Sequence, residues 1–154
     1  MPPKFSLQSV LDYYHSRVET LEVELSRLQL AYQQAQAYLE ALRASQAELF
    51  EKLRQKQVGD LDLAELDNLR LNVKIVEARI EQQLATLAAL AQQIERQRQL
   101  LVAARQDEET LNILKEKEEA RYRAEELKQE NRLREDIYIS QAHRRAVSGS
   151  AGSF

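Results

Sequence analysis

Residues 57–62 read QVGDLD and contain Gly59, the one glycine outside the last six residues of the chain. Both prolines lie within the first three residues, so the composition supplies one clear turn. Gly59 can adopt a positive φ and end a preceding helix. Asp62 can cap a following helix, with Glu65 as its capping-box partner. The segment therefore predicts a turn at residues 58–61 between two helices.

Before this turn, apolar residues recur at alternating spacings of four and three residues. Thirteen of the fourteen positions are apolar or aromatic: Leu7, Leu11, Tyr14, Val18, Leu21, Leu25, Leu28, Tyr32, Ala35, Leu39, Leu42, Gln46, Leu49 and Leu53. A period of 3.5 residues sustained for about seven heptads is typical of a coiled coil. We predict a first helix over residues 6–57, preceded by an N-terminal lead at 1–5.

A second stripe of the same length follows the turn. Eleven of its fourteen positions are apolar: Leu66, Leu69, Val73, Val76, Ile80, Gln83, Leu87, Leu90, Ile94, Gln97, Leu101, Ala104, Glu108 and Leu111. Two equal stripes joined by a short turn predict an all-α fold, a two-helix antiparallel coiled-coil hairpin. The predicted facing pairs are Leu53–Leu66, Gln46–Val73, Leu39–Ile80, Leu25–Ile94 and Leu7–Leu111.

The polar members of the stripes have two interpretations. They are Gln46, Gln83, Gln97 and Glu108. The simpler interpretation is that a seam between only two helices stays partly exposed to water and therefore tolerates polar side chains. Alternatively, polar side chains at such positions fix the register of a coiled coil at some cost in stability.

Beyond Leu111 the stripe fails. Residues 115–136 carry fifteen charged side chains and no glycine or proline, so the helix should continue without an apolar partner. Ion pairs at helical spacing are available in Glu118–Arg121, Glu119–Arg123 and Glu130–Arg134. We predict a second helix over 62–145, with 112–145 as a long overhang, and a disordered tail at 146–154 because of its Gly and Ser content.

The composition excludes several classes of protein. Ala, Glu, Lys, Leu and Arg make up 84 of the 154 residues, and the net charge is −3 with both signs mixed. A basic footprint for nucleic acid is therefore absent. The sequence lacks cysteine, a transmembrane-length apolar run and the apolar core of a signal peptide, so we expect a cytoplasmic protein without disulfides.

The sequence also shows no recognisable catalytic chemistry. His15 and His143 stand far apart and in no metal-ligand spacing, and a glycine-rich phosphate loop is missing. Carboxylate pairs on an exposed coiled coil lack the cleft that would perturb their pKa values. We expect no enzymatic activity, no cofactor and no small-molecule substrate, so function should reside in surfaces that bind other proteins.

The two ends of the chain carry a family pattern. The opening FSLQSVL at residues 5–11 resembles the F-x-L-x-x-V-L start of the flagellar export protein family FliJ. The segment LKEK at 114–117, followed by Tyr122, Glu126 and Glu130, is similar to that family's second-helix motif. Glu135-Asp136 and then Arg144-Arg145 resemble its acidic pair and later basic residues, although the acidic pair stands in reversed order here.

The resemblance implies a soluble component of a bacterial flagellar type III secretion apparatus, peripheral to the membrane and needed for motility. In that family the coiled coil is similar to the central stalk of rotary ATPases, and its terminal ends enter the ring of the export ATPase hexamer. The residues that match the ATPase-contacting ends are Phe5, Leu7, Leu11, Lys115, Lys117, Arg121, Tyr122, Arg123, Glu130 and Asp136.

The resemblance also implies that the tip half of the hairpin contacts a membrane export gate protein, and that the chain engages export chaperones. The residues that match the gate-binding tip are Tyr38, Leu42, Leu49 and Val76. At other matching places this chain has Ser45, Asn72 and Arg79.

Three other kinds of protein are alternatives, and the first of them shares the predicted architecture. They are the stalk protein of an injectisome, a structural coiled coil that self-associates, and a stalk subunit of an ion-translocating rotary ATPase. Stalk subunits of the last kind usually carry a globular domain between their helices, and the short turn at 58–61 leaves no room for one.

Overall fold

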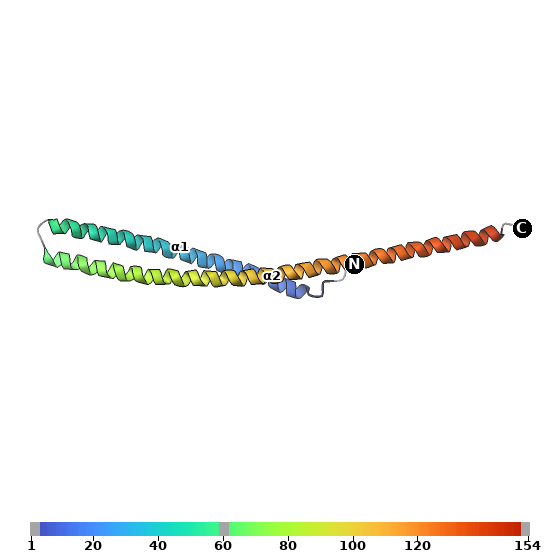
Figure 1. Cartoon of the computed structure of the whole chain (residues 1–154), viewed down its shortest axis with the longest axis horizontal. Coiled ribbons are helices and arrows are strands. Elements are labelled where there is room, and N and C mark those ends of the chain that lie inside the picture. Colours follow the sequence, from blue (N-terminus) through green and yellow to red (C-terminus); the bar gives the residue numbers. More distant parts are fainter. Residues whose placement is uncertain (1–3, 59–61, 152–154) are drawn as a thin grey trace. The chain divides into compact units, whose positions relative to one another are not determined.

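The computed structural model describes residues 4–58 and 62–151, and Gly59 lies outside them. The described residues form two α-helices, α1 at Gln8–Val58 and α2 at Leu63–Ala151, and contain no strand (Figure 1). The helices pack against one another and run in opposite directions, which confirms the predicted all-α hairpin.

The chain divides into two compact units. The first, which we call the hairpin unit, is His15–Arg105 and contains most of α1 and the first half of α2. The second, which we call the terminal unit, combines Met1–Tyr14 with Gln106–Phe154. The terminal unit joins two segments that are far apart in the sequence, whereas the hairpin unit is one continuous stretch.

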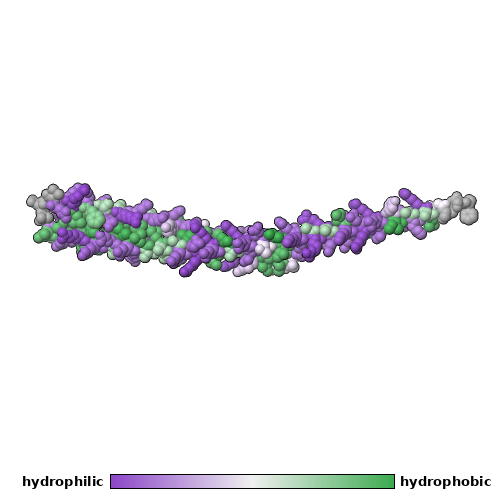
Figure 2. All heavy atoms as spheres, in the orientation of Figure 1, coloured by the Kyte–Doolittle hydropathy of each residue, from purple (hydrophilic) through white to green (hydrophobic). Residues whose placement is uncertain are grey.

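The predicted stripes form the core of the hairpin unit. All of their members in this unit are buried or half-buried. The two buried clusters, each with the half-buried residues packed on it, are Val18, Leu21, Leu101 and Ala104 with Leu25, and Ala35, Leu39 and Leu87 with Tyr32, Ile80 and Leu90. Hydrophobic atoms accordingly line the seam between the two helices (Figure 2). Leu39 and Ile80 share a cluster, in agreement with the predicted register.

Two of the polar stripe residues bond across the seam. The side-chain amide of Gln83 donates to the Ala35 carbonyl at 2.8 Å, and that of Gln97 donates to the Leu21 carbonyl at 3.3 Å. Every heptad offers such a carbonyl, so these bonds satisfy the amides without selecting a register. The further bond from Gln97 to the Glu24 carboxylate, at 2.9 Å, is specific to one heptad.

The start of α2 is capped as predicted. The Asp62 carboxylate accepts hydrogen bonds from the backbone amides of Ala64 at 3.1 Å and Glu65 at 3.5 Å. The carboxylate of Glu65, however, binds the ammonium group of Lys56 on α1 at 2.7 Å. Glu65 therefore links the two helices beside the turn.

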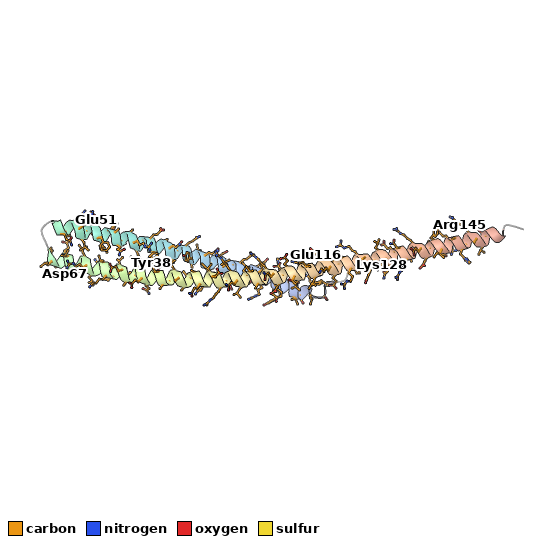
Figure 3. The ribbon with its side chains drawn as sticks, viewed as in Figure 1. Tyr38, Glu51, Asp67, Glu116, Lys128 and Arg145 are labelled. Atoms are coloured by element: carbon orange, nitrogen blue, oxygen red, sulfur yellow. The ribbon has the colours of Figure 1, made fainter. Side chains whose placement is uncertain are left out.

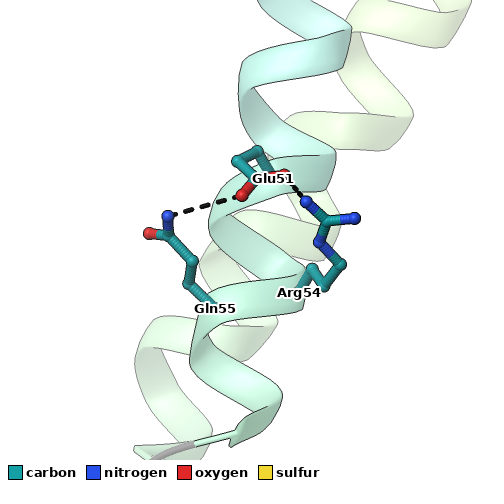
Figure 4. Close-up of polar contacts among 3 residues, drawn as sticks. All are labelled: Glu51, Arg54 and Gln55. Atoms are coloured by element: carbon teal, nitrogen blue, oxygen red, sulfur yellow. Dashed lines mark hydrogen bonds and ion pairs between the residues drawn. The ribbon is translucent and has the colours of Figure 1, made fainter.

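Side-chain hydrogen bonds between neighbouring residues lie on the exposed surface of α1 near its end. Glu51 accepts hydrogen bonds from Arg54 and, at 3.4 Å, from Gln55, three and four residues further along α1 (Figure 4). Pairs of this kind contribute roughly 0.2–0.5 kcal/mol each. They support the helix, whereas burial of the apolar seam holds the two helices together.

In the terminal unit α2 continues to Ala151, which corrects the expected disordered tail for residues 146–151. A glycine in a helix costs about 1 kcal/mol relative to alanine but does not break it, and Gly149 lies within α2. The hydroxyl of Ser148 donates to the Arg145 carbonyl at 3.3 Å and continues the local bonding.

Residues 123–149 of α2 present their side chains to solvent. Every residue from 123 to 149 is exposed, and Lys128 and Arg145 project from the helix in Figure 3. Of the three expected ion pairs, Glu119–Arg123 forms at 3.8 Å. Within the described residues, Glu118–Arg121 and Glu130–Arg134 form no ion pair.

The register makes a direct prediction for crosslinking. Leu39→Cys combined with Ile80→Cys should form a disulfide within one chain, because the two residues pack in the same cluster and the chain has no other cysteine. Non-reducing electrophoresis should show a fast-migrating monomer. Leu39→Cys with Val73→Cys, one heptad out of register, is the matched control. Crosslinks that form between chains alone would contradict the hairpin.

Burial predicts very different costs for two leucines of α1. Leu21 is 3% exposed and Leu30 is 55% exposed. Leu21→Ala should lower the free energy of unfolding by about 2 kcal/mol or more, because it removes buried methyl groups and leaves a cavity. Leu30→Ala should change it by less than about 0.5 kcal/mol. Urea unfolding followed by circular dichroism measures both, and equal losses would refute the assignment of the core.

Candidate functional site

The terminal unit contains a groove between the beginning of the chain and α2. Its volume is about 590 Å³. The residues that line it are Lys4, Phe5 and Gln8 from the first segment and Lys115, Glu119, Tyr122, Arg123 and Glu126 from α2. Two aromatic side chains and five charged ones therefore meet in one concave surface.

The first segment is held by a turn that precedes α1. The backbone amide of Gln8 donates to the Phe5 carbonyl at 3.0 Å, and both residues are half-buried. Opposite them, Lys115 and Tyr122 are half-buried on α2. The expectation that α2 lacks an intramolecular partner from residue 112 is therefore corrected for the stretch that lines this groove.

The continuation of the heptad explains the correction. Lys115 and Tyr122 follow Glu108 at intervals of seven residues, so they lie on the face of α2 that belongs to the stripe. The aliphatic stem of a lysine and the ring of a tyrosine can cover apolar surface while their polar ends reach water. The stripe thus persists in a polar form beyond Leu111.

Some of the charged and polar side chains in the groove interact with one another. Burial, a hydrogen bond to the Glu126 side chain and its negative charge raise the pKa of the Tyr122 phenol above its ordinary value. Arg123 pairs with Glu119 at 3.8 Å. Within the described residues, Lys4 and Lys115 form no ion pair.

The groove brings together four of the ten predicted ATPase-contacting residues, namely Phe5, Lys115, Tyr122 and Arg123. Leu7 is 40% exposed and remains available to a partner, whereas Leu11 is 7% exposed and belongs to the core. Four others lie exposed on α2 outside the groove: Lys117, Arg121, Glu130 and Asp136.

Sequence reasoning did not single out Lys4 and Gln8, and it did not place Glu119 and Glu126 at a groove, although all four residues line it. Their role depends on where the first segment lies against α2, which heptad spacing does not specify. The available signal was the seven-residue interval from Glu108 to Lys115 and Tyr122, which marks the face of α2 that the first segment covers.

A second groove lies near the turn, in the hairpin unit. Its volume is about 390 Å³, and it is lined by Ser45, Glu48, Leu49, Lys52, Asn72, Ile75, Val76 and Arg79. It contains Leu49 and Val76 from the predicted gate-binding tip. Tyr38 is 48% exposed outside this groove, and Leu42 is 6% exposed and buried in the seam.

Two kinds of feature are absent from the described residues: a metal-binding cluster and a membrane-spanning helix. They contain no group of three or more His, Cys, Asp or Glu side chains that could hold a metal ion. None of their helices is sufficiently long and apolar to cross a membrane. What the surface does offer is grooves lined by mixed charged and apolar side chains at the first segment and near the turn.

The described residues thus form an all-α helical hairpin with grooves on its surface. The family model "Flagellar FliJ protein" matches residues 3–147. The chain therefore belongs to the FliJ family and is a flagellar export-related protein. Searches among curated proteins and among solved structures find no match.

Tyr122 makes a prediction about pH. Its pKa is raised in the folded protein. The folded state therefore holds the phenolic proton more tightly than the unfolded chain, in which the pKa is about 10. The stability that this difference contributes is fully present below a pH of about 10 and is lost as the pH rises through the pKa of the folded state. Glu126→Gln should lower the pKa of Tyr122, and NMR titration of ring-labelled tyrosine measures it. An unchanged pKa in this variant would exclude Glu126 as a cause.

Proposed function

We propose that this protein is a non-enzymatic stalk and adaptor of a flagellar type III export apparatus. In this proposal the terminal unit engages the export ATPase hexamer, and the part of the hairpin near the turn engages the membrane export gate protein or export chaperones. The family match supports the export role, and the two grooves supply surfaces for the two kinds of partner.

The observation that carries the ATPase part of the proposal is the exposure of α2 beyond the first groove. A helix with every side chain exposed from residue 123 to 149 has little to stabilise it in isolation. Its dense charge of both signs suits a surrounding surface with polar walls. A ring of ATPase subunits would cover such a helix on all sides, and the contacts would be largely electrostatic.

The observation that supports a partner near the turn is the groove at Leu49 and Val76. These two apolar side chains are half-buried, and Lys52 and Arg79 line the same groove. A partner that buries apolar surface there would gain affinity from desolvation, while the two cations would favour an acidic rim on that partner.

Truncation tests the ATPase part directly. A chain that ends after Leu111 keeps both apolar stripes and should remain a helical hairpin, but it should lose binding to the export ATPase. Pull-down and calorimetry with the purified ATPase measure binding, and circular dichroism checks the fold. Charge reversal of Arg121 and Arg123 in the full chain should weaken binding partially, more so at low salt because screening is then weak.

Hydrogen exchange provides an independent measurement. Amides of residues 127–145 should exchange quickly in the free protein and slowly once the ATPase is added. A structural coiled coil that self-associates would show no response to the ATPase in any variant. Strong protection of this stretch in the free monomer would remove the physical basis for insertion into a ring.

A further inference from the structure

The groove at the first segment has a distinctive imbalance of charge. Of its five charged side chains, Arg123 is paired with Glu119, and Glu126 is engaged with Tyr122. Lys4 and Lys115 remain, one from each wall of the groove, and neither forms an ion pair within the described residues. The groove therefore presents two uncommitted cations to whatever enters it.

The same groove also offers aromatic surface. Phe5 and Tyr122 are both half-buried, so each ring still has surface that a further apolar side chain could cover. Burial of apolar area favours binding, and aromatic rings are well suited to serve as anchors of a binding site. The groove therefore combines two aromatic rings with two cations that form no ion pair.

We propose that this groove binds a segment of the export ATPase that carries both an apolar side chain and carboxylates. This inference rests on the proposed function. The apolar side chain would pack against Phe5 and Tyr122, and the carboxylates would pair with the ammonium groups of Lys4 and Lys115. The contact therefore has an apolar part, in addition to the charged contacts along the rest of α2.

The charges already in the groove favour this occupant over others. A polyphosphate backbone would meet Glu119 and Glu126 as well as the lysines, and repulsion by these carboxylates opposes it. A basic segment would leave Lys4 and Lys115 unpaired and add like charge. An acidic and apolar segment pairs the free cations and leaves the internal pairs intact.

Binding of the purified export ATPase to the full-length chain tests the proposal. Lys115→Glu and Phe5→Ala should each weaken binding about tenfold or more, and their combination should weaken it further. The matched control is Lys74→Glu, which makes the same change at an exposed site of the hairpin unit and should leave binding unchanged. Circular dichroism checks that every variant stays helical.

Salt separates the two parts of the contact. The loss caused by Lys115→Glu should shrink as ionic strength rises, because an ion pair at an open groove is screened. The loss caused by Phe5→Ala should persist at high salt, because apolar burial is not screened. If both losses respond to salt in the same way, the assignment of an apolar part to the contact is wrong.

A photo-crosslink identifies the occupant. Benzoylphenylalanine in place of Phe5 should capture an ATPase peptide that contains Asp or Glu next to an apolar residue. Capture of a basic peptide, or of a second copy of this chain alone, would overturn the inference. If the ATPase binds wild type and all groove variants equally, the groove inference fails and the proposed function stands. If the ATPase does not bind wild type, both fail.

Discussion

Burial of two matched apolar stripes against each other is the constraint on which this structure depends. Neither helix has another apolar face that the described residues cover, and local ion pairs such as Glu51–Arg54 contribute little. The stripes also fix which residues remain outside: everything off the seam stays in contact with solvent. The seam therefore creates the fold and, by exclusion, the surfaces that are available to partners.

The seam is not uniformly apolar, and its polar positions have different consequences. Gln83 and Gln97 reach backbone carbonyls across the seam, so the cost of placing an amide there is largely offset. The bond from Gln97 to Glu24 adds a contact that depends on one particular register. A seam that is partly exposed to water accounts for the bonds to the backbone carbonyls. Selection of the register applies to the bond between Gln97 and Glu24.

The terminal unit shows how a coiled-coil face can change its role without a break in the helix. The interval of seven residues continues through Lys115 and Tyr122, but the partner is a short non-helical segment at Phe5 instead of a second helix. Such a segment covers less surface than a helix would. What remains uncovered is a groove with aromatic and charged walls, which is where we propose that the export ATPase adds its own side chains.

The sequence by itself determined the fold class, the cap at Asp62 and nearly all of the core, because a period of 3.5 residues specifies the buried face of each helix directly. The family pattern at the two ends could also be recognised from the residues alone. Only the tertiary structure decided the groove. The position of Lys4 and Phe5 against Tyr122 depends on how a short non-helical segment lies across α2, and no periodicity encodes that placement. Likewise, the structure shows that Leu11 and Leu42, which the family pattern assigns to partner contacts, are buried in the described protein.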